Sequence, residues 1–258
     1  MTTRTDQLPR EREVDDMQPT VLPDTEGTHS IRRASLVAGI GILVIAALAV
    51  FGDVFVVEGL VTPGDAARTA TDVMASEGLF RLGVLSLYLV VVLDVVVAWA
   101  LFRVFAPVNE GISRLAAWFR LAYAGVFMVA LGQLAGIPHL LSSAGYSSAF
   151  GTEGVQAQAL LRADAYHDIW MAGLVLFGAH LLLLGYLAYR SSYIPKILGV
   201  LLAVAGFGYV FDSFGEVLGE GAPSISTVTF LGEFLLAVWL VIRSRHISFA
   251  ATQEGSRS

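Results

Sequence analysis

Long uninterrupted runs of apolar residues constrain this chain more than any other feature. The clearest example is the stretch from Phe177 to Gly215, where two apolar segments are joined by a short polar turn that contains Arg190, Ser191, Ser192 and Lys196. Each segment approaches the about 20 residues that an α-helix needs to cross the hydrocarbon core of a bilayer. A helical hairpin that crosses a membrane twice is therefore predicted for this stretch.

The composition of the whole chain agrees with a membrane protein. Of the 258 residues, 55% are hydrophobic and only 15% are charged, and the mean hydropathy is +0.69. A soluble domain carries about 25% charged residues, so a soluble globular protein is excluded. No basic patch with interleaved aromatic residues is present, which excludes nucleic acid as a partner. The chain has no cysteine, which excludes disulfides, iron–sulfur clusters and thiol catalysis.

Six apolar runs predict an all-α, polytopic membrane protein that is a bundle of six transmembrane helices. They cover Ala34–Val57, Phe80–Phe105, Ile112–Leu141, Ala165–Tyr189, Ile194–Leu218 and Ile225–Ile242. The six-span membrane domain is thus expected to comprise residues 31–246. The polar segments 1–30 and 247–258 lack the apolar residues needed to fold alone, so both are predicted to be disordered tails. The two longer connections, residues 58–79 and 142–164, are expected to be either short interfacial helices or plain loops.

Lys and Arg are unevenly divided between the two ends of the predicted spans. One set of ends carries most of them: Arg32, Arg33, Arg103, Arg114, Arg190, Lys196, Arg243 and Arg245. The opposite set carries Arg68, Arg81 and Arg162 among many acidic residues. Cytoplasmic span ends are enriched in Lys and Arg. Both termini are therefore predicted to be cytoplasmic, in the inner (plasma) membrane of a bacterial cell.

Ionisable side chains near the middle of the spans form a first polar layer, where a polar group is costly and often functional. They are Asp94, Arg120, His180 and Glu233. With about 1.5 Å of rise per residue, Asp94 and Arg120 lie at similar depths on consecutive helices, which predicts an ion pair between them. His180 and Glu233 can form hydrogen bonds between the fourth and sixth spans. The layer either only fixes the packing of the helices or belongs to a path for protons or ions.

A second polar layer lies toward the outer ends of the spans. It consists of Asp53, Glu58, His139, His167, Asp168, Tyr209, Asp212 and Glu216. Imidazole and carboxylate are the ligands that a cysteine-free chain can offer a divalent metal. The candidate ligands are His139, His167, Asp212 and Glu216. No HExxH or HxxxH motif supports such a site, and the alternative is that these groups only meet interfacial water. No other cofactor is predicted.

Glycine and tryptophan are expected to have structural roles. Glycines of the fifth span are expected to allow close helix packing: Gly199, Gly206, Gly208 and Gly215. The tryptophans near span ends are expected to anchor the protein at the membrane interface: Trp99, Trp118, Trp170 and Trp239.

Three segments carry a family resemblance. They are FRLGVLSLYL at 80–89, VNEGISRLAAWFRLAYA at 108–124 and HLLLLGYLAYRSSYIPKILGVLLAVAGFGYVFDSFG at 180–215. Together they resemble the bacterial integral membrane family catalogued as domain of unknown function 4386, over residues 33–243. The resemblance implies a six-span bundle. It brings no established activity, so it assigns no catalytic residue.

These observations predict a non-enzymatic membrane protein that binds or passes a small molecule or ion, or that has a sensory or accessory role in the cell envelope. Its expected partners are the lipid bilayer and a small-molecule or lipid ligand. The alternative is a membrane-embedded hydrolase or transferase that uses the outer His and carboxylate groups, with Zn²⁺ as one option. A purely structural partner protein is a further alternative. Spatial proximity of the four candidate metal ligands would favour the enzyme.

Overall fold

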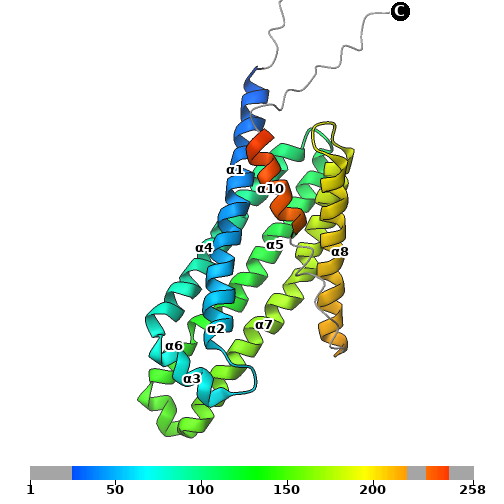
Figure 1. Ribbon diagram of the computed structural model, residues 1–258. Coiled ribbons are helices and arrows are strands. Elements are labelled where there is room, and N and C mark those ends of the chain that lie inside the picture. The colour runs from blue at the N-terminus through cyan, green and yellow to red at the C-terminus, as the bar shows by residue number, and fades with distance from the viewer. Residues whose placement is uncertain (1–24, 220–230, 244–258) are drawn as a thin grey trace, which may run out of the picture.

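The computed structural model describes residues 25–219 and 231–243, and within these ranges every regular element is helical. In chain order the elements are α1 (Thr25–Ala49), the π-helix η1 (Val50–Val57), α2 (Glu58–Leu60), α3 (Ala66–Ala75), α4 (Glu77–Phe105), α5 (Glu110–Ala135), α6 (Ile137–Ser142), α7 (Ala144–Arg190), α8 (Lys196–Leu218) and α10 (Leu231–Arg243). The long helices lie side by side in an elongated bundle (Figure 1). The predicted all-α class is confirmed for the described residues.

Because α1 begins at Thr25, the predicted tail of residues 1–30 is wrong at its last residues; the rest of both tails lies outside the described residues.

Five helical segments of the described chain are long and apolar enough to cross a membrane. They are Ile31–Leu60, Glu77–Phe105, Glu110–Ser142, Ala144–Arg190 and Lys196–Glu216, and they coincide with the first five predicted spans. The predicted span Ile225–Ile242 falls partly on residues outside the described ranges. Its described part is α10, whose 13 residues are fewer than a bilayer core of about 30 Å requires. The described structure thus supports five candidate spans and does not establish the sixth.

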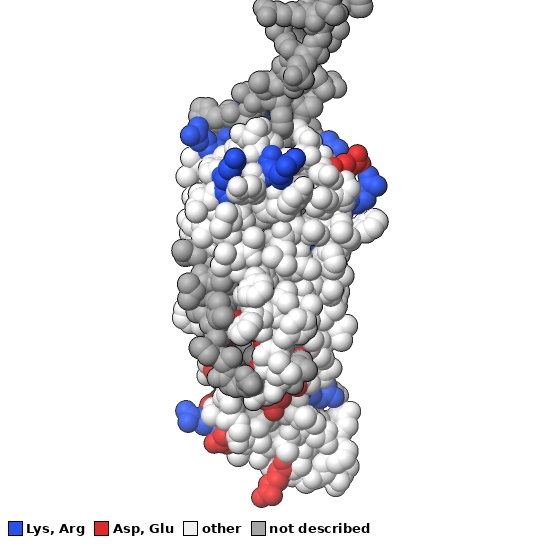
Figure 2. Space-filling model, turned by 90° about the vertical axis from the view of Figure 1, so that its right-hand side faces the viewer, with Lys and Arg blue, Asp and Glu red and all other residues white. Residues whose placement is uncertain are grey.

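The surface of the bundle is apolar where a lipid would contact it. On α4, Leu82, Leu85 and Leu89 are 54%, 57% and 55% exposed, whereas Asp94 on the same helix is buried. A space-filling view shows a broad band of uncharged side chains, with Lys and Arg gathered at one end and most acidic residues toward the other (Figure 2). A hydrocarbon environment favours this arrangement, in which apolar side chains cover the surface and polar side chains are buried inside.

The first span changes its helical geometry halfway along. In η1 the amide N–H of Glu58 donates to the carbonyl oxygen of Asp53, five residues back, which is the hydrogen-bond pattern of a π-helix. The turn is wider, and it packs closely on α4 through glycine. A Cβ atom on Gly52 would lie 2.8 Å from the carbonyl oxygen of Gly83, too close for any side chain. Close packing of the π-helix against α4 holds Asp53 at the interior side of the first span.

The helices α7 and α8 form the hairpin that the sequence predicts, and their main chains are in direct contact. A Cβ atom on Gly178 would lie 2.6 Å from the carbonyl oxygen of Gly206, and one on Gly185 would lie 2.7 Å from that of Gly199. The predicted packing role is confirmed for Gly199 and Gly206. Glycines at facing sites allow this approach because they carry no side chain. The contact fixes α8 beside α7 over most of the length of the hairpin.

The turn of this hairpin is attached to a third helix. The hydroxyl of Tyr193 donates to the carbonyl oxygen of Val104 on α4 at 2.6 Å. The hydroxyl of Ser191 donates to the carbonyl oxygen of Ala188 at 2.8 Å and accepts from the amide of Ile194 at 3.2 Å. These bonds pair main-chain groups at the C-terminal ends of α4 and α7 and in the turn, and they hold the arginine-rich end of the bundle together.

The helix α7 continues well beyond the predicted fourth span. Gly151 has non-helical dihedral angles (φ 73°, ψ 166°) and divides α7 into two helices at a kink. The longer one, residues 152–190, corresponds to about 60 Å at 1.5 Å per residue. The predicted connection 142–164 is therefore mostly the first part of α7. The connection 58–79 contains α3, which begins with a hydrogen bond of 2.9 Å from the amide of Arg68 to the side chain of Asp65. Helices, and not plain loops, therefore form most of both connections, and α3 and α6 pack against α7.

The glycine contact between α7 and α8 leads to a stability prediction. Replacing Gly185 by Ala places a Cβ atom against the main chain of α8, so we expect the free energy of unfolding to fall by about 1–3 kcal/mol. Replacing Gly125 by Ala is the matched control, because a Cβ atom there meets nothing within 4 Å. This control should be neutral or gain about 0.5–1 kcal/mol from the higher helix propensity of Ala. Thermal unfolding in detergent measures both; equal effects would contradict the close contact.

Candidate functional site

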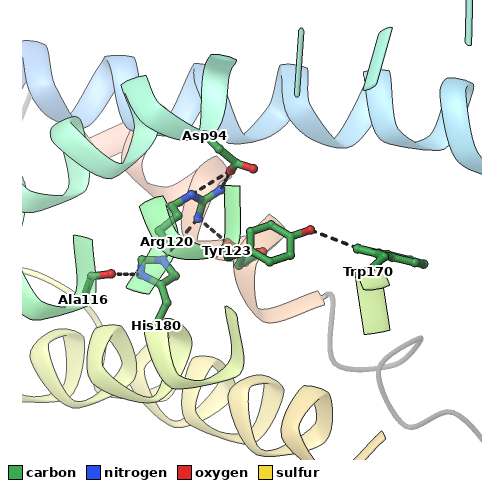
Figure 3. A network of polar contacts seen from close by, with 7 residues as sticks. Asp94, Ala116, Arg120, Tyr123, Trp170 and His180 are labelled. Atoms are coloured by element: carbon green, nitrogen blue, oxygen red, sulfur yellow. Dashed lines mark hydrogen bonds and ion pairs between the residues drawn. The ribbon is translucent and has the colours of Figure 1, made fainter. Parts of the chain in front are cut away.

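A buried arginine is the centre of a polar network inside the bundle (Figure 3). Arg120 lies midway along α5, and its side chain is 2% exposed. Its Nε donates to Oδ1 of Asp94 on α4 at 2.9 Å, and its Nη2 lies 2.6 Å from the same oxygen. Its Nη1 donates to Oε1 of Glu233 on α10 at 3.1 Å. The predicted ion pair between Asp94 and Arg120 is present, and Glu233 contributes a second carboxylate to it.

His180 completes the network from α7, on the other side of the guanidinium from Asp94 (Figure 3). Its Nδ1 lies 2.8 Å from the carbonyl oxygen of Ala116, and its Nε2 lies 3.3 Å from Nη1 of Arg120. A carbonyl oxygen only accepts and a guanidinium only donates. The imidazole therefore carries its proton on Nδ1 and accepts at Nε2, as a neutral ring. The predicted bond between His180 and Glu233 is replaced by contacts of each with Arg120.

The network has more acidic than basic groups. Two carboxylates and one guanidinium meet, and the imidazole is neutral. With both carboxylates ionised the formal charge is one negative charge. An uncompensated charge inside a low-dielectric bundle costs several kcal/mol, so the network favours a bound cation or an additional proton.

A cavity of about 180 Å³ lies directly beside this network. We call it the central cavity, and it is bounded by α1, η1, α4, α5, α7, α8 and α10. Asp94, Arg120 and Glu233 form its charged wall, and Asp53 of η1 lies on its lining as well. Six aromatic side chains also line it: Tyr123, Phe127, Tyr166, Trp170, Phe177 and Tyr209. The buried ion pairs therefore face a space large enough for a ligand.

The aromatic rings of the central cavity touch one another in sequence. The ring centroids of Tyr123 and Phe177 are 4.8 Å apart, and those of Phe177 and Tyr209 are 5.5 Å apart. Tyr166 stacks on Trp170 at 6.2 Å, and the indole Nε1 of Trp170 donates to the hydroxyl oxygen of Tyr123 at 3.1 Å. The guanidinium carbon of Arg120 already lies 5.3 Å from the ring centre of Phe177. Aromatic faces attract cations, and this wall presents several of them.

A larger hollow of about 620 Å³ adjoins the central cavity; we call it the vestibule. Its polar lining consists of Asp53, Glu58, Asp164, Tyr166, His167, Asp168 and Glu216. The two hollows share Asp53, Tyr166 and Trp170, and the hydroxyl of Tyr166 donates to Oδ1 of Asp53 at 2.8 Å. These shared residues form the boundary between the vestibule and the central cavity.

The predicted outer layer is therefore only partly assembled. Five residues of the predicted outer layer line the vestibule together: Asp53, Glu58, His167, Asp168 and Glu216. Tyr209 lines the central cavity instead. Asp212 is buried on α8, and neither it nor His139 is among the vestibule residues. His139 lies on α6 with its ring 6.2 Å from that of Tyr146.

The metal site that the sequence allowed is not formed by the described residues. Among residues 25–219 and 231–243, no three His, Asp or Glu side chains are grouped closely enough to hold a metal ion. The prediction grouped His139, His167, Asp212 and Glu216 because all were placed at outer helix ends. Helix ends at one depth can still lie on different sides of a bundle, and here His167 and Glu216 line the vestibule whereas His139 and Asp212 do not.

The aromatic wall was not predicted from the sequence. Trp170 was expected at the membrane interface, but its indole lines the central cavity and donates to Tyr123. A signal was present in the spacing along the helices. Tyr123 follows Arg120 by three residues and Phe177 precedes His180 by three, so each lies on the same helix face as a buried ionisable residue.

The arginine network leads to a second stability prediction. Arg120→Ala leaves two buried carboxylates without their cation, so we expect a loss of about 3–5 kcal/mol in the free energy of unfolding. Asp94→Ala should cost less, because Glu233 still pairs with Arg120. The double replacement should lose less than the sum of the two single losses. Denaturation of the protein in detergent measures each step of this cycle.

An exposed ion pair on α4 provides the control. Arg81 and Glu77 pair at the helix surface, with side chains 55% and 37% exposed, so Glu77→Ala should cost no more than about 0.5 kcal/mol. Strictly additive losses for Asp94 and Arg120 would contradict their direct contact.

Comparison with known proteins agrees with the resemblance seen in the sequence. The family described as "Domain of unknown function (DUF4386)" matches residues 37–244. A relative named "Uncharacterized protein", from Archaeoglobus fulgidus, is 36% identical over 165 residues, which are 64% of this chain and 85% of the relative. That relative is archaeal, so the predicted bacterial origin is not confirmed. No solved structure matches the chain. The chain belongs to the DUF4386 family.

Proposed function

We propose that this protein binds a small molecule or ion in the central cavity, and that the ligand arrives through the vestibule. The observation that carries the proposal is that the two hollows are adjacent and share Asp53, Tyr166 and Trp170 in their linings. The larger hollow adjoins the smaller one, whose lining includes Asp94, Arg120 and Glu233. A wide approach and a narrow charged end are typical of a binding site.

A purely structural role for the network accounts for less. Ion pairs that only fix helix packing need no ligand-sized space beside them. Here the same groups face a cavity of about 180 Å³. A water molecule occupies about 30 Å³ in the liquid, so this volume corresponds to about six water molecules. The cavity is smaller than the about 300–1,000 Å³ of a site for a drug-sized ligand, which favours an ion or a small molecule.

Binding is favoured over free passage in the conformation described here. Toward the arginine-rich end, the interior is filled by apolar side chains with 0% exposure, among them Phe105, Leu187 and Leu202. We therefore take the vestibule, and not the arginine-rich end, as the approach to the ligand site. Passage to the opposite side would require a second conformation, as in transporters that alternate access to a central site, whereas a sensor needs only the binding step.

The enzyme alternative lacks the support that it needs. A hydrolase or transferase built on the outer layer would draw on His139, His167, Asp212 and Glu216 together, but His139 and Asp212 are not among the vestibule residues. We therefore give the binding function precedence.

The orientation that we propose places both termini in the cytoplasm and the vestibule outside. Lys and Arg gather at one end of the bundle (Figure 2). Arg103, Arg190 and Lys196 lie at the ends of α4, α7 and α8 next to the hairpin turn, whereas the vestibule residue Glu216 lies at the opposite end of α8. A reporter fused after Arg245 should report cytoplasm, because positively charged flanks stay on that side. A reporter inserted at Thr152 should report the outside. The opposite pattern would place the vestibule on the cytoplasmic side.

Cysteine labelling tests whether water reaches the central cavity. The chain has no cysteine, so a single introduced thiol can be followed alone. Ala49 lines the central cavity, and a thiol there should react with membrane-impermeant methanethiosulfonates added on the vestibule side, since the reactive thiolate forms only where water is present. Labelling of Ala49→Cys in sealed vesicles, followed by mass, gives the rate.

Ala47 is the matched control, two residues away on the same helix but exposed on the outer surface of α1. Ala47→Cys would face lipid, so it should react at least about ten-fold more slowly than Ala49→Cys. Leu184→Cys, at a buried site away from the central cavity, should be similarly slow. Equal, slow labelling of all three variants would refute an accessible cavity.

A further inference from the structure

The charges and rings around the central cavity also indicate which class of ligand it takes. We infer that the ligand is a small organic cation with an ammonium group, held between carboxylates and aromatic faces. This inference rests on the proposed function, because it requires that a ligand reaches the central cavity.

The first argument is the balance of charged groups on the cavity wall. Asp53, Asp94 and Glu233 supply three carboxyl groups, whereas Arg120 is the single cationic side chain among the lining residues. The carboxyl of Asp53 receives one hydrogen bond, from the neutral hydroxyl of Tyr166. The wall therefore has an excess of negative charge, which a bound cation would compensate.

The second argument is that Arg120 has little capacity left for an anion. A guanidinium has five N–H donors. In this structure Nε and Nη2 contact Asp94, and Nη1 contacts both Glu233 and His180. Only one N–H of Nη2 is left without a contact among these, so an anionic ligand that needs two or more donors would have to displace a protein carboxylate, whereas a cation can bind without breaking any of these contacts.

The third argument distinguishes an organic cation from a metal ion. The lining offers several aromatic ring faces. Its carboxylates are not gathered around one point, because the described residues form no group of three metal-binding side chains. An ammonium group with alkyl substituents is weakly hydrated and binds well to aromatic faces and carboxylates together. A small inorganic ion would lose its hydration shell without receiving enough oxygen ligands in return.

The vestibule has the charge that would attract such a ligand. Its lining contains five acidic residues: Asp53, Glu58, Asp164, Asp168 and Glu216. His167 is the one histidine in this lining, which contains no Lys or Arg. Acidic clefts raise the local concentration of cations and their rate of arrival. The path to the cavity and the cavity itself thus favour the same sign of charge.

Two thiol reagents of similar size and opposite charge test the inference. Ala49→Cys is labelled with a methanethiosulfonate that carries a trimethylammonium group and with one that carries a sulfonate. Each rate is divided by the rate of the same reagent with Ala149→Cys, at an exposed residue outside both hollows. We expect the normalised rate to be at least about ten-fold higher for the cationic reagent.

Replacement of single carboxylates assigns the preference to the cavity wall. Glu233→Gln removes one negative charge and keeps the shape of the side chain, so the preference should fall by at least about three-fold. If that variant does not fold, Asp53→Asn removes a charge at the half-buried boundary and should act in the same direction. Glu153→Gln is the control, since Glu153 is exposed and lines neither hollow; it should leave the preference unchanged.

Protection experiments identify the source of the ammonium group. Tetramethylammonium chloride should slow the labelling of Ala49→Cys when compared with sodium chloride at the same concentration. Slower labelling in vesicles that contain phosphatidylcholine than in vesicles of phosphatidylglycerol alone would instead assign the ammonium group to a lipid headgroup. Absence of both effects overturns the inference.

The two proposals fail in different ways. If neither reagent labels Ala49→Cys, water does not reach the cavity and the proposed function is wrong. If both reagents label it with equal normalised rates, or the sulfonate is faster, the cavity is accessible but the cation inference is wrong. A preference that survives both Glu233→Gln and Asp53→Asn would also overturn it.

Discussion

A fully buried guanidinium in the middle of the bundle is the constraint on which the rest of the structure depends. A charge in a low-dielectric interior is tolerated only when it is paired and hydrogen-bonded. Arg120 on α5 meets this requirement with Asp94 from α4, Glu233 from α10 and the neutral ring of His180 from α7. Four helices are therefore held at fixed relative depths by one side chain. Because two carboxylates pair with one guanidinium, the interaction that holds the helices together also leaves the site with an excess of negative charge.

Two features of the backbone support the space beside this network. Glycine contacts bring α7 and α8 together, so that Phe177 and Tyr209 meet ring to ring on the cavity wall. The π-helix in the first span packs on α4 through Gly52, and it holds Asp53 within reach of the hydroxyl of Tyr166. Wide helical turns often occur at functional sites. Here one such turn lies at the boundary between the vestibule and the central cavity.

The fold was predictable where it depends on hydrophobicity along the chain. The first five spans, the hairpin of α7 and α8 and the pair of Asp94 and Arg120 follow from apolar runs and from depth along a helix. The extension of α7 through residues 144–164 was not predictable in this way. That segment is too polar to resemble a membrane span, and only the structure shows that it is helical and that α3 and α6 pack against α7.

The sequence by itself determined that this chain forms apolar helices, and which ionisable residues lie midway along them, because depth depends only on residue number and rise per residue. Only the tertiary structure decided which of these residues meet. Glu233 contacts Arg120 and not His180, His139 lies on α6 outside the vestibule, and Trp170 lines the central cavity. The order of helices around the bundle and their rotation about their own axes decide such contacts. Those two quantities arise from packing between helices, which no single helix encodes.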